Sequence, residues 1–159
     1  MIRITDQYFW NVVFGIFFVL LVVMGAIILE TEARIPYTEL TLVDFSLITL
    51  ATWRLIRLFV YDPITKFLRE QFYDLKKVGK GMVLEKPKFG PRRTIADLLS
   101  CPWCFGMWAA ASVTFFYLLT PYAYYITIFL AISAVASFLQ ILTNMVEWQA
   151  EKLKMEVEG

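Results

Sequence analysis

The chain has two cysteines, Cys101 and Cys104, in a Cys-Pro-Trp-Cys stretch at the start of an apolar segment. Because Pro102 lacks an N–H, it suits the first turn of a helix, where that group would be unpaired. We therefore expect Cys101 near the N-cap and Cys104 one turn later, with both sulfurs on one side of the helix start. A cysteine pair at a helix N-terminus is suited to thiol–disulfide chemistry, because unpaired N–H groups and the helix dipole favour the thiolate.

Three interpretations of this pair stay open. Under the first, Cys101 and Cys104 form a redox pair, since Cys-Pro-Trp-Cys is similar to the active-site tetrapeptide of glutaredoxins, although the strand–helix context of thioredoxin-like folds is missing. Under the second, cysteine pairs from two or more subunits share a zinc ion, because two cysteines from one chain cannot complete a four-ligand site. Under the third, which we favour, both thiols pack beside Trp103 and Trp108 at the helix start.

We do not expect a structural disulfide between Cys101 and Cys104. The distribution of basic residues predicts that both cysteines lie at the cytoplasmic surface of a membrane protein. Ordinary thiols in the cytoplasm are kept reduced by the glutathione and thioredoxin systems. The sequence therefore predicts free thiols and, apart from the shared zinc ion of the second interpretation, no cofactor.

Histidine is absent from the chain, and this removes the commonest general base and the commonest metal ligand. Ser-His-Asp and Cys-His mechanisms are excluded for the same reason. No acid–base pair is evident elsewhere, so we predict that the protein is not an enzyme. The net charge of +1 indicates no nucleic-acid partner.

The composition indicates an integral membrane protein, because 59% of the 159 residues are hydrophobic and the mean hydropathy is +0.62. Apolar segments long enough to cross a hydrocarbon core of roughly 30 Å predict an all-α fold with four transmembrane helices. These helices are expected at about residues 8–29, 40–61, 103–120 and 122–148. Residues 1–61 would hold the first two helices, 62–100 a cytoplasmic connection, and 101–159 the last two helices and a charged tail.

The connection is predicted to begin with an amphipathic helix over residues 62–77, with Asp62 as N-cap and Pro63 as the first helical residue. One face is apolar and the other basic, so we expect it to lie on the membrane surface against anionic lipid headgroups. Residues 78–93 should form a basic loop, and 95–99 a short helix that Thr94 caps. The lipid-facing basic residues are Lys66, Arg69, Lys76 and Lys77.

Positive charges are distributed unevenly between the two sides of the predicted membrane domain. The connection carries nine Lys or Arg, the C-terminal tail adds Lys152 and Lys154, and Arg3 precedes the first helix. On the other side, the acidic loop 30–39 keeps only Arg34. The positive-inside rule therefore predicts a bacterial cytoplasmic membrane protein with both termini and the connection in the cytoplasm.

Arg54 and Arg57 interrupt the second predicted helix one to two turns from its cytoplasmic end, where snorkelling lowers the cost of a charge in lipid. We expect a polar layer in which an acidic residue pairs with one arginine and a tryptophan stacks on another. The alternative is that both arginines simply reach lipid phosphate. The expected acidic partner is Glu147 or Asp97, and the expected stacking partner is Trp53 or Trp108.

Two segments resemble a family of small bacterial and phage multi-pass membrane proteins of unknown function, which includes a Bacillus sporulation membrane protein. They are Leu-Ala-Thr-Trp-Arg-Leu-Ile-Arg-Leu at 50–58, followed by Asp62, and Leu-Leu-Ser-Cys-Pro-Trp-Cys-Phe-Gly-Met-Trp at 98–108. The resemblance implies that the arginine pair and the cysteine motif belong to one structural unit, and it implies no activity. The structural or interaction residues predicted from the arginine layer, the cysteine motif and this resemblance are Arg54, Arg57, Asp62, Cys101, Pro102, Trp103, Cys104, Gly106, Trp108 and Glu147.

These features predict a non-enzymatic membrane scaffold or interaction protein. Small residues such as Gly15, Gly25, Ala109, Ala131 and Ala134 allow close helix packing in lipid, so the partner is expected to be a second copy or another membrane protein. One alternative is a regulator that uses its cysteine pair for redox or metal chemistry. Another alternative is an oligomeric pore. The first, third and fourth helices argue against a pore, because they have no continuous hydrophilic face.

Overall fold

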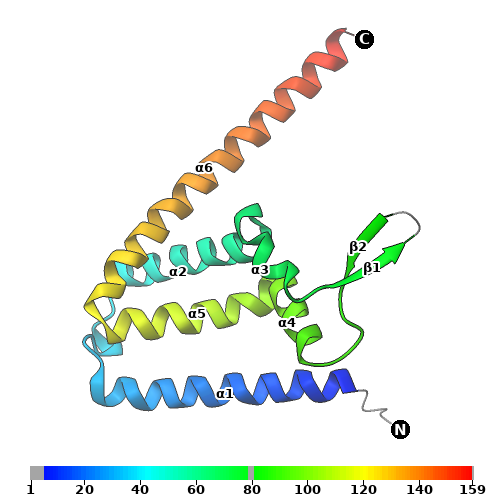
Figure 1. Ribbon diagram of the computed structural model, residues 1–159. Helices are drawn as coiled ribbons and strands as arrows, with labels where there is room; N and C mark the ends of the chain where they lie inside the picture. Colours follow the sequence, from blue (N-terminus) through cyan, green and yellow to red (C-terminus); the bar gives the residue numbers. More distant parts are fainter. Residues whose placement is uncertain (1–5, 79–80, 159) are drawn as a thin grey trace.

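The computed structural model describes residues 6–78 and 81–158. Long helices dominate the described chain: α1 (Asp6–Glu32), α2 (Leu42–Ile56), α5 (Pro102–Leu119) and α6 (Pro121–Glu158). A π-helix, η2 (Arg57–Tyr61), continues α2 directly. Helices α1, α2 and α5 lie side by side, whereas α6 starts beside α2 and then projects away at an angle (Figure 1). A long helix occupies each of the four predicted segments; with η2 counted as part of the second, the ends of the first three differ by at most three residues, whereas α6 continues ten residues beyond the expected end at 148.

Three of these helices are candidate membrane spans by length and apolar composition: Gln7–Glu32, Pro102–Leu119 and Pro121–Glu156. Helix α2 is not among them, because its α-helical part has 15 residues. The chain therefore has the mostly helical, membrane-like architecture expected from its composition.

Small side chains bring α2, α5 and α6 together. Ala51 of α2 and Ala134 of α6 are 0% exposed, and Ala109 of α5 is 4% exposed. A Cβ added at Gly106 would lie 3.1 Å from Cδ1 of Ile56, so glycine allows α5 to approach α2 closely. The close packing predicted for these small residues is confirmed. At Gly15 a Cβ would meet nothing within 4 Å, so this glycine makes no such contact in the described chain.

Polar contacts fix the start of α2 against the end of α5. The Asp44 carboxylate accepts a hydrogen bond from the Thr41 N–H at 3.0 Å, and the Asp44 N–H donates to Thr41 Oγ1 at 3.2 Å, which completes a capping box. The Tyr117 hydroxyl, on α5, donates to the same carboxylate. The acidic loop that connects α1 and α2 contains the short 3-10 helix η1 (Tyr37–Glu39).

The predicted amphipathic helix over 62–77 is wrong. The chain forms a 3-10 helix, η3 (Pro63–Thr65), and a single helical turn, α3 (Lys66–Glu70). Residues of the expected helix and loop then pair as an antiparallel hairpin of β1 (Asp74–Val78) and β2 (Gly81–Glu85), with Leu75 opposite Leu84. The physical reason is local, because Gly79-Lys80 is a two-residue hairpin turn signal with glycine at its first position. Residues 79–80 themselves lie outside the described part.

The short helix before the cysteines is confirmed but longer than expected, since α4 spans Pro91–Ser100. It begins after Gly90, whose φ of +98° is the left-handed region that glycine adopts without strain. The predicted capping role of Thr94 is wrong, because Thr94 lies within the helix and is 8% exposed. Helix α4 leads through Cys101 directly into α5, so the sharp α4–α5 junction places the cysteine motif at one end of the helical bundle (Figure 1).

Candidate functional site

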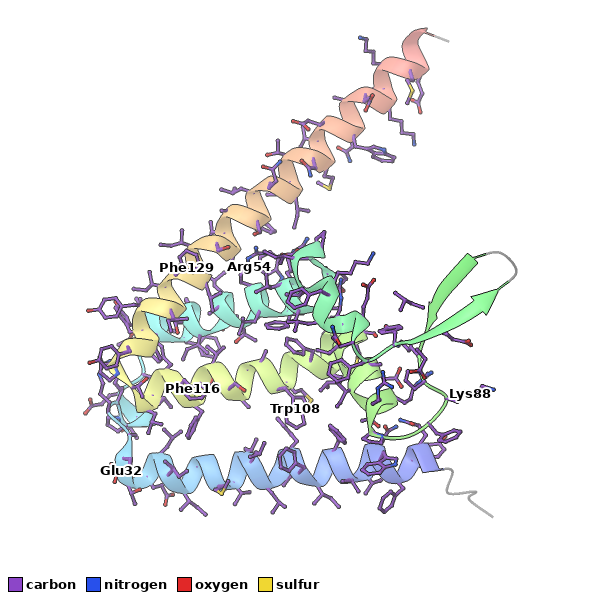
Figure 2. The ribbon with its side chains drawn as sticks, in the orientation of Figure 1. Glu32, Arg54, Lys88, Trp108, Phe116 and Phe129 are labelled. Carbon is purple, nitrogen blue, oxygen red and sulfur yellow. A yellow bond between two sulfur atoms is a disulfide. The ribbon has the colours of Figure 1, made fainter. Side chains whose placement is uncertain are left out.

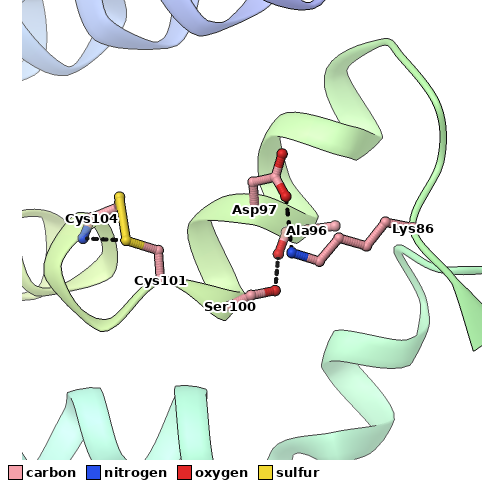
Figure 3. The surroundings of a disulfide bond; sticks show 6 residues. All are labelled: Lys86, Ala96, Asp97, Ser100, Cys101 and Cys104. Carbon is pink, nitrogen blue, oxygen red and sulfur yellow. Dashed lines mark hydrogen bonds and ion pairs between the residues drawn. A yellow bond between two sulfur atoms is a disulfide. The ribbon is translucent and has the colours of Figure 1, made fainter.

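The cysteine pair occupies the first turn of α5. Cys101 is the N-cap residue and Pro102 the first helical residue, as predicted. The Cys104 N–H donates to Cys101 Sγ at 3.2 Å, and a disulfide joins the two residues, whose Cα atoms are 5.3 Å apart (Figure 3). The expectation of free thiols is therefore wrong. It rested on the redox state of a compartment, whereas one helical turn between the two cysteines brings their sulfurs within bonding reach.

The two tryptophans of the motif differ in their surroundings. Trp103 is 85% exposed, so it does not pack beside the sulfurs. Trp108 lies between α5 and α1, with its ring centroid 4.8 Å from that of Phe18 (Figure 2). Cys104 is exposed and Cys101 half-buried. Cys104 is thus the more accessible residue of the pair.

A pocket of about 550 Å³ opens beside the disulfide, between α1, α4 and α5. Its apolar wall comes mainly from aromatic side chains of α1 and α5, and its polar end from α4 and the residue that follows β2. The lining residues include Phe14, Gly15, Phe18, Lys86, Cys101 and Trp108. Cys104 and Asp97 also line it.

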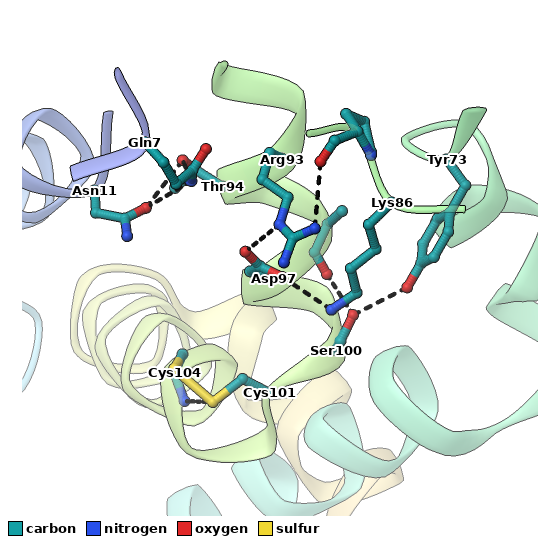
Figure 4. A network of polar contacts seen from close by, with 12 residues as sticks. Gln7, Asn11, Tyr73, Lys86, Arg93, Thr94, Asp97, Ser100, Cys101 and Cys104 are labelled. Carbon is teal, nitrogen blue, oxygen red and sulfur yellow. Dashed lines mark hydrogen bonds and ion pairs between the residues drawn. A yellow bond between two sulfur atoms is a disulfide. The ribbon is translucent and has the colours of Figure 1, made fainter. Parts of the chain in front are cut away.

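An ion-pair cluster forms the polar end of the pocket. The Asp97 carboxylate accepts from Lys86 Nζ at 2.9 Å and from Arg93 Nε at 2.8 Å (Figure 4). Partial burial opposes ionisation of Asp97, but the hydrogen bonds and charges of Lys86 and Arg93 outweigh it and hold the pKa of Asp97 below its ordinary value. Lys86 is therefore held at the pocket by a carboxylate that stays ionised at neutral pH.

Amide and hydroxyl groups connect α1 to α4 at the same end. Gln7 Nε2 donates to Asn11 Oδ1 at 3.0 Å and to Thr94 Oγ1 at 2.9 Å, and the Thr94 hydroxyl donates to Asn11 Oδ1 at 3.1 Å (Figure 4). This three-residue contact fixes the wall of the pocket that α1 contributes. Sequence reasoning missed it, because polar residues at the end of a membrane helix are usual and do not indicate which helix they contact.

The arginine layer has other partners than those predicted. Arg54 donates to Asp62 Oδ2 at 2.9 Å and to Ser133 Oγ at 2.8 Å. Arg57 lies over the rings of Trp53 and Tyr61, at 5.7 and 5.8 Å from their centroids. The ring contact with Trp53 is confirmed. Asp62 is the N-cap residue of η3 and Pro63 its first residue, as predicted, but the Asp62 side chain makes no cap hydrogen bond and is instead the acidic partner of Arg54.

The two acidic partners proposed for the arginine layer lie elsewhere. Glu147 is exposed on the projecting half of α6, and Asp97 pairs with Arg93. The sequence signal that would have identified Asp62 as the partner of Arg54 is their separation along the chain. Eight residues make a little more than two helical turns, so both side chains lie near the same face.

The predicted lipid-facing cations differ in their surroundings. The Arg69 guanidinium donates to the carbonyl oxygens of Phe59 and Asp62, both at 3.3 Å, and to that of Val60, so it caps the end of η2. Lys66 forms an exposed ion pair with Glu70 at 3.5 Å. The side chains of Lys76 and Lys77 lie outside what the structure describes. Within the described residues, no group of three or more Cys, Asp or Glu side chains is arranged to hold a metal ion.

Comparison with known proteins locates both motifs in a recognised family. Residues 47–143 match the family described as "Protein of unknown function (DUF1360)", a range that includes the arginine layer and the cysteine motif but not α1. The chain is 35% identical over 85 residues to UPF0713 protein YngL of Bacillus subtilis, which covers 52% of this chain and 64% of that protein. The match to YngL thus spans less than two thirds of its length.

A second relative matches over most of its own length. The chain is 34% identical over 111 residues to Sporulation protein YjcA of Bacillus subtilis, which covers 66% of this chain and 92% of that protein. No solved structure matches. The family match and the coverage of YjcA show that the chain belongs to the DUF1360 family of proteins of unknown function.

Proposed function

We propose that this chain is a four-pass protein of the bacterial cytoplasmic membrane, with both termini and the segment between η2 and α5 in the cytoplasm. Helix α2 and η2 together have 15 + 5 = 20 residues, and a helix of that length extends for roughly 30 Å. Apart from Arg34 and the helical residues Arg54 and Arg57, the basic residues of this chain lie in the segments that a four-pass arrangement places on one side of the membrane, and the positive-inside rule makes that side cytoplasmic. The relatives in Bacillus subtilis support a bacterial setting.

Within this membrane the protein acts as a non-enzymatic interaction protein, and the projecting half of α6 is its contact surface. The observation that carries this proposal is that every residue from 138 to 156 is exposed. This stretch includes large apolar side chains such as Met145 (49% exposed) and Trp148 (63% exposed). A long helix with so much apolar surface and no neighbouring helix among the described residues of its own chain is suited to a partner helix.

The partner that fits best is a second copy of α6. Ala131 and Ala134 are buried, and the ring of Phe138 contacts Trp53 of α2. These three residues share one face of α6. The same face continues along the projecting half of α6, where apolar residues recur at alternating spacings of three and four residues, which is the repeat of a helix–helix seam. Its further members are Ile141, Met145 and Trp148.

Native mass spectrometry of the full chain, released gently from detergent, tests this proposal. We expect a defined oligomer for the wild type and a monomer for the combined variant Ile141→Ala, Met145→Ala and Trp148→Ala. The matched control, Leu139→Ala, Val146→Ala and Leu153→Ala, changes exposed apolar residues on another face of the same helix and should keep the oligomer. A wild type that stays monomeric, or an equal effect of both variants, contradicts a seam of identical helices.

A second candidate function has its own supporting observation, the disulfide between Cys101 and Cys104 beside an open pocket. We propose that this pair makes the protein a thiol-redox regulator, whose interactions depend on the oxidation state of the two sulfurs. The same mass spectra, recorded with and without reductant, test it. A disulfide that reductant removes, together with a change in subunit number that Cys101→Ser abolishes, is the expected result. Reduced thiols under all conditions contradict it.

A further inference from the structure

We infer that the pocket between α1, α4 and α5 binds a lipophilic quinone, which oxidises the reduced Cys101–Cys104 pair. This inference rests on the redox function proposed for that pair and names its oxidant. The cysteine pair would then report the oxidation state of a membrane-soluble electron carrier to an interaction protein.

The walls of the pocket fit a flat apolar ring. Phe14 and Phe18 of α1 and Trp108 of α5 line it, and the Trp108 and Phe18 rings contact one another at a centroid distance of 4.8 Å. The volume of about 550 Å³ lies within the range of roughly 300–1,000 Å³ typical of small-molecule sites. Because α1 and α5 are both candidate membrane spans, a ligand dissolved in the bilayer reaches these walls without crossing water.

The polar end of the pocket supplies a donor for a quinone oxygen. Lys86 lines the pocket, and its Nζ is held by Asp97 at 2.9 Å. An ammonium group has three N–H donors, so the contact with Asp97 leaves Lys86 able to donate to a further oxygen. A positive charge at this place also stabilises the negative charge that develops on a quinone as it accepts electrons.

The two sulfurs are positioned for a two-electron oxidation. Both line the pocket; Cys104 is exposed, and Cys101 Sγ accepts a hydrogen bond from the Cys104 N–H, which stabilises charge on that sulfur. In the reaction both S–H bonds break and the S–S bond forms. The two electrons pass to the quinone, and its two carbonyl oxygens take up the two protons and become hydroxyl groups. The products are the disulfide and one hydroquinone.

The proposed orientation of the protein is what makes a membrane oxidant necessary. At the cytoplasmic surface the glutathione pool reduces ordinary disulfides. A disulfide at this place therefore needs an oxidant that the soluble pool does not control, and a quinone dissolved in the bilayer is such an oxidant. The apolar access from α1 is consistent with that route.

Gly15 allows the pocket to be closed without disturbing the fold. It lines the pocket, and a Cβ at this position would meet nothing within 4 Å. Gly15→Leu therefore fills the pocket from the α1 side, and it replaces glycine by a better helix former. The matched control is Ile16→Leu, because Ile16 is 57% exposed and does not line the pocket.

The experiment uses the full chain in lipid nanodiscs, reduced and then freed of reductant without oxygen. Ubiquinone-1 is added, and free thiols are counted by maleimide mass shift while loss of quinone absorbance is followed. We expect one quinone to be consumed for each cysteine pair, and Gly15→Leu to slow thiol loss at least about tenfold, which corresponds to about 1.4 kcal/mol. Ile16→Leu should react as the wild type does.

A small oxidant that needs no pocket, diamide, separates failure of this inference from failure of the redox function. If diamide forms the disulfide but ubiquinone-1 does not, or if Gly15→Leu reacts at the wild-type rate with ubiquinone-1, the quinone site is disproved and the redox function stands. If diamide also forms no disulfide, the redox function itself is disproved.

Binding is tested apart from chemistry in the double variant Cys101→Ser and Cys104→Ser. A quinone in the pocket lies against Trp108 and quenches its fluorescence, so we expect saturable quenching that Gly15→Leu removes. Quenching that is linear in quinone concentration, and equal in the presence of Gly15→Leu, contradicts a site.

Discussion

The Arg54 guanidinium donates to the Asp62 carboxylate at 2.9 Å across the whole length of η2. It also donates to Ser133 of α6 at 2.8 Å, so one side chain connects α2, the end of η2 and α6. The side chains of Arg54 and Asp62 are only 19% and 22% exposed. A charge pair in such surroundings matters mainly because removal of one partner leaves the other without compensation.

Replacement of Asp62 tests this connection. Asp62→Asn should lower the free energy of unfolding by about 2 kcal/mol, because it removes a charged hydrogen-bond acceptor from Arg54. The measurement is unfolding of the detergent-solubilised protein in a denaturant series. Glu70→Gln is the matched control, since the Lys66–Glu70 pair is 3.5 Å long and 66% and 37% exposed, and such pairs contribute little. Equal losses in the two variants contradict a special role of Asp62.

Asp97 should give the protein a pH-dependent contribution to stability. Its pKa is lowered in the folded state, so the ion pairs with Lys86 and Arg93 stabilise the fold above the unfolded pKa of about 3.9 and lose this effect as the pH falls through the folded pKa. We expect Asp97→Asn to be less stable than the wild type at neutral pH, and the difference to begin to shrink below about pH 4 and to disappear once the pH is below the folded pKa. Thermal unfolding at a series of pH values measures it.

The control for that experiment is Glu151→Gln, which changes an exposed carboxylate on the free half of α6. Its stability should follow that of the wild type at every pH. A difference between the wild type and Asp97→Asn that stays constant across the acid range contradicts an ionic contribution.

Gly106 should tolerate little added volume. A Cβ there lies 3.1 Å from Ile56 Cδ1, so Gly106→Leu forces α5 away from α2 and should cost about 1–3 kcal/mol. Removal of the opposing side chain in the double variant with Ile56→Ala should restore part of the loss. Gly15→Leu is the same substitution where the added side chain meets open space, and it should not lower the free energy of unfolding. No rescue by Ile56→Ala contradicts the contact.

Features that depend on local chemistry could be predicted from the sequence. Apolar length predicts the helices, and Pro102 predicts both the start of α5 and the N-cap at Cys101. Small residues such as Ala134 predict where helices approach. In each case a few neighbouring residues determine the local structure, and contacts with distant parts of the chain do not change it.

The hairpin β1–β2 shows where periodicity misleads. Residues 74–78 satisfy both a helical and a strand pattern, because a segment of five residues is too short to separate the two periods. The turn signal Gly79-Lys80 favours a hairpin, and it carries more information than the spacing of the lysines.

The pocket could not be predicted, because it needs α1 placed against α4. The Gln7–Thr94 contact that fixes this placement joins residues 87 positions apart, and nothing in either segment indicates the other. The ion-pair partner of Arg54 could have been predicted, because Asp62 lies in the same sequence motif. The interpretation of Asp62 as a helix N-cap left out this second role of its side chain.

The oxidation state of Cys101 and Cys104 in intact cells tests the central claim most directly. Cells that produce the full chain are quenched with acid, and free thiols are then alkylated before the mass of the intact protein is measured. We predict a population without added alkyl groups, which falls when respiration is blocked downstream of the quinone pool, because the pool is then reduced, and grows when electron entry upstream of the pool is blocked, because the pool is then oxidised. Two alkyl groups on every molecule under all conditions would contradict the account, and the cysteine motif would then be a structural helix start only.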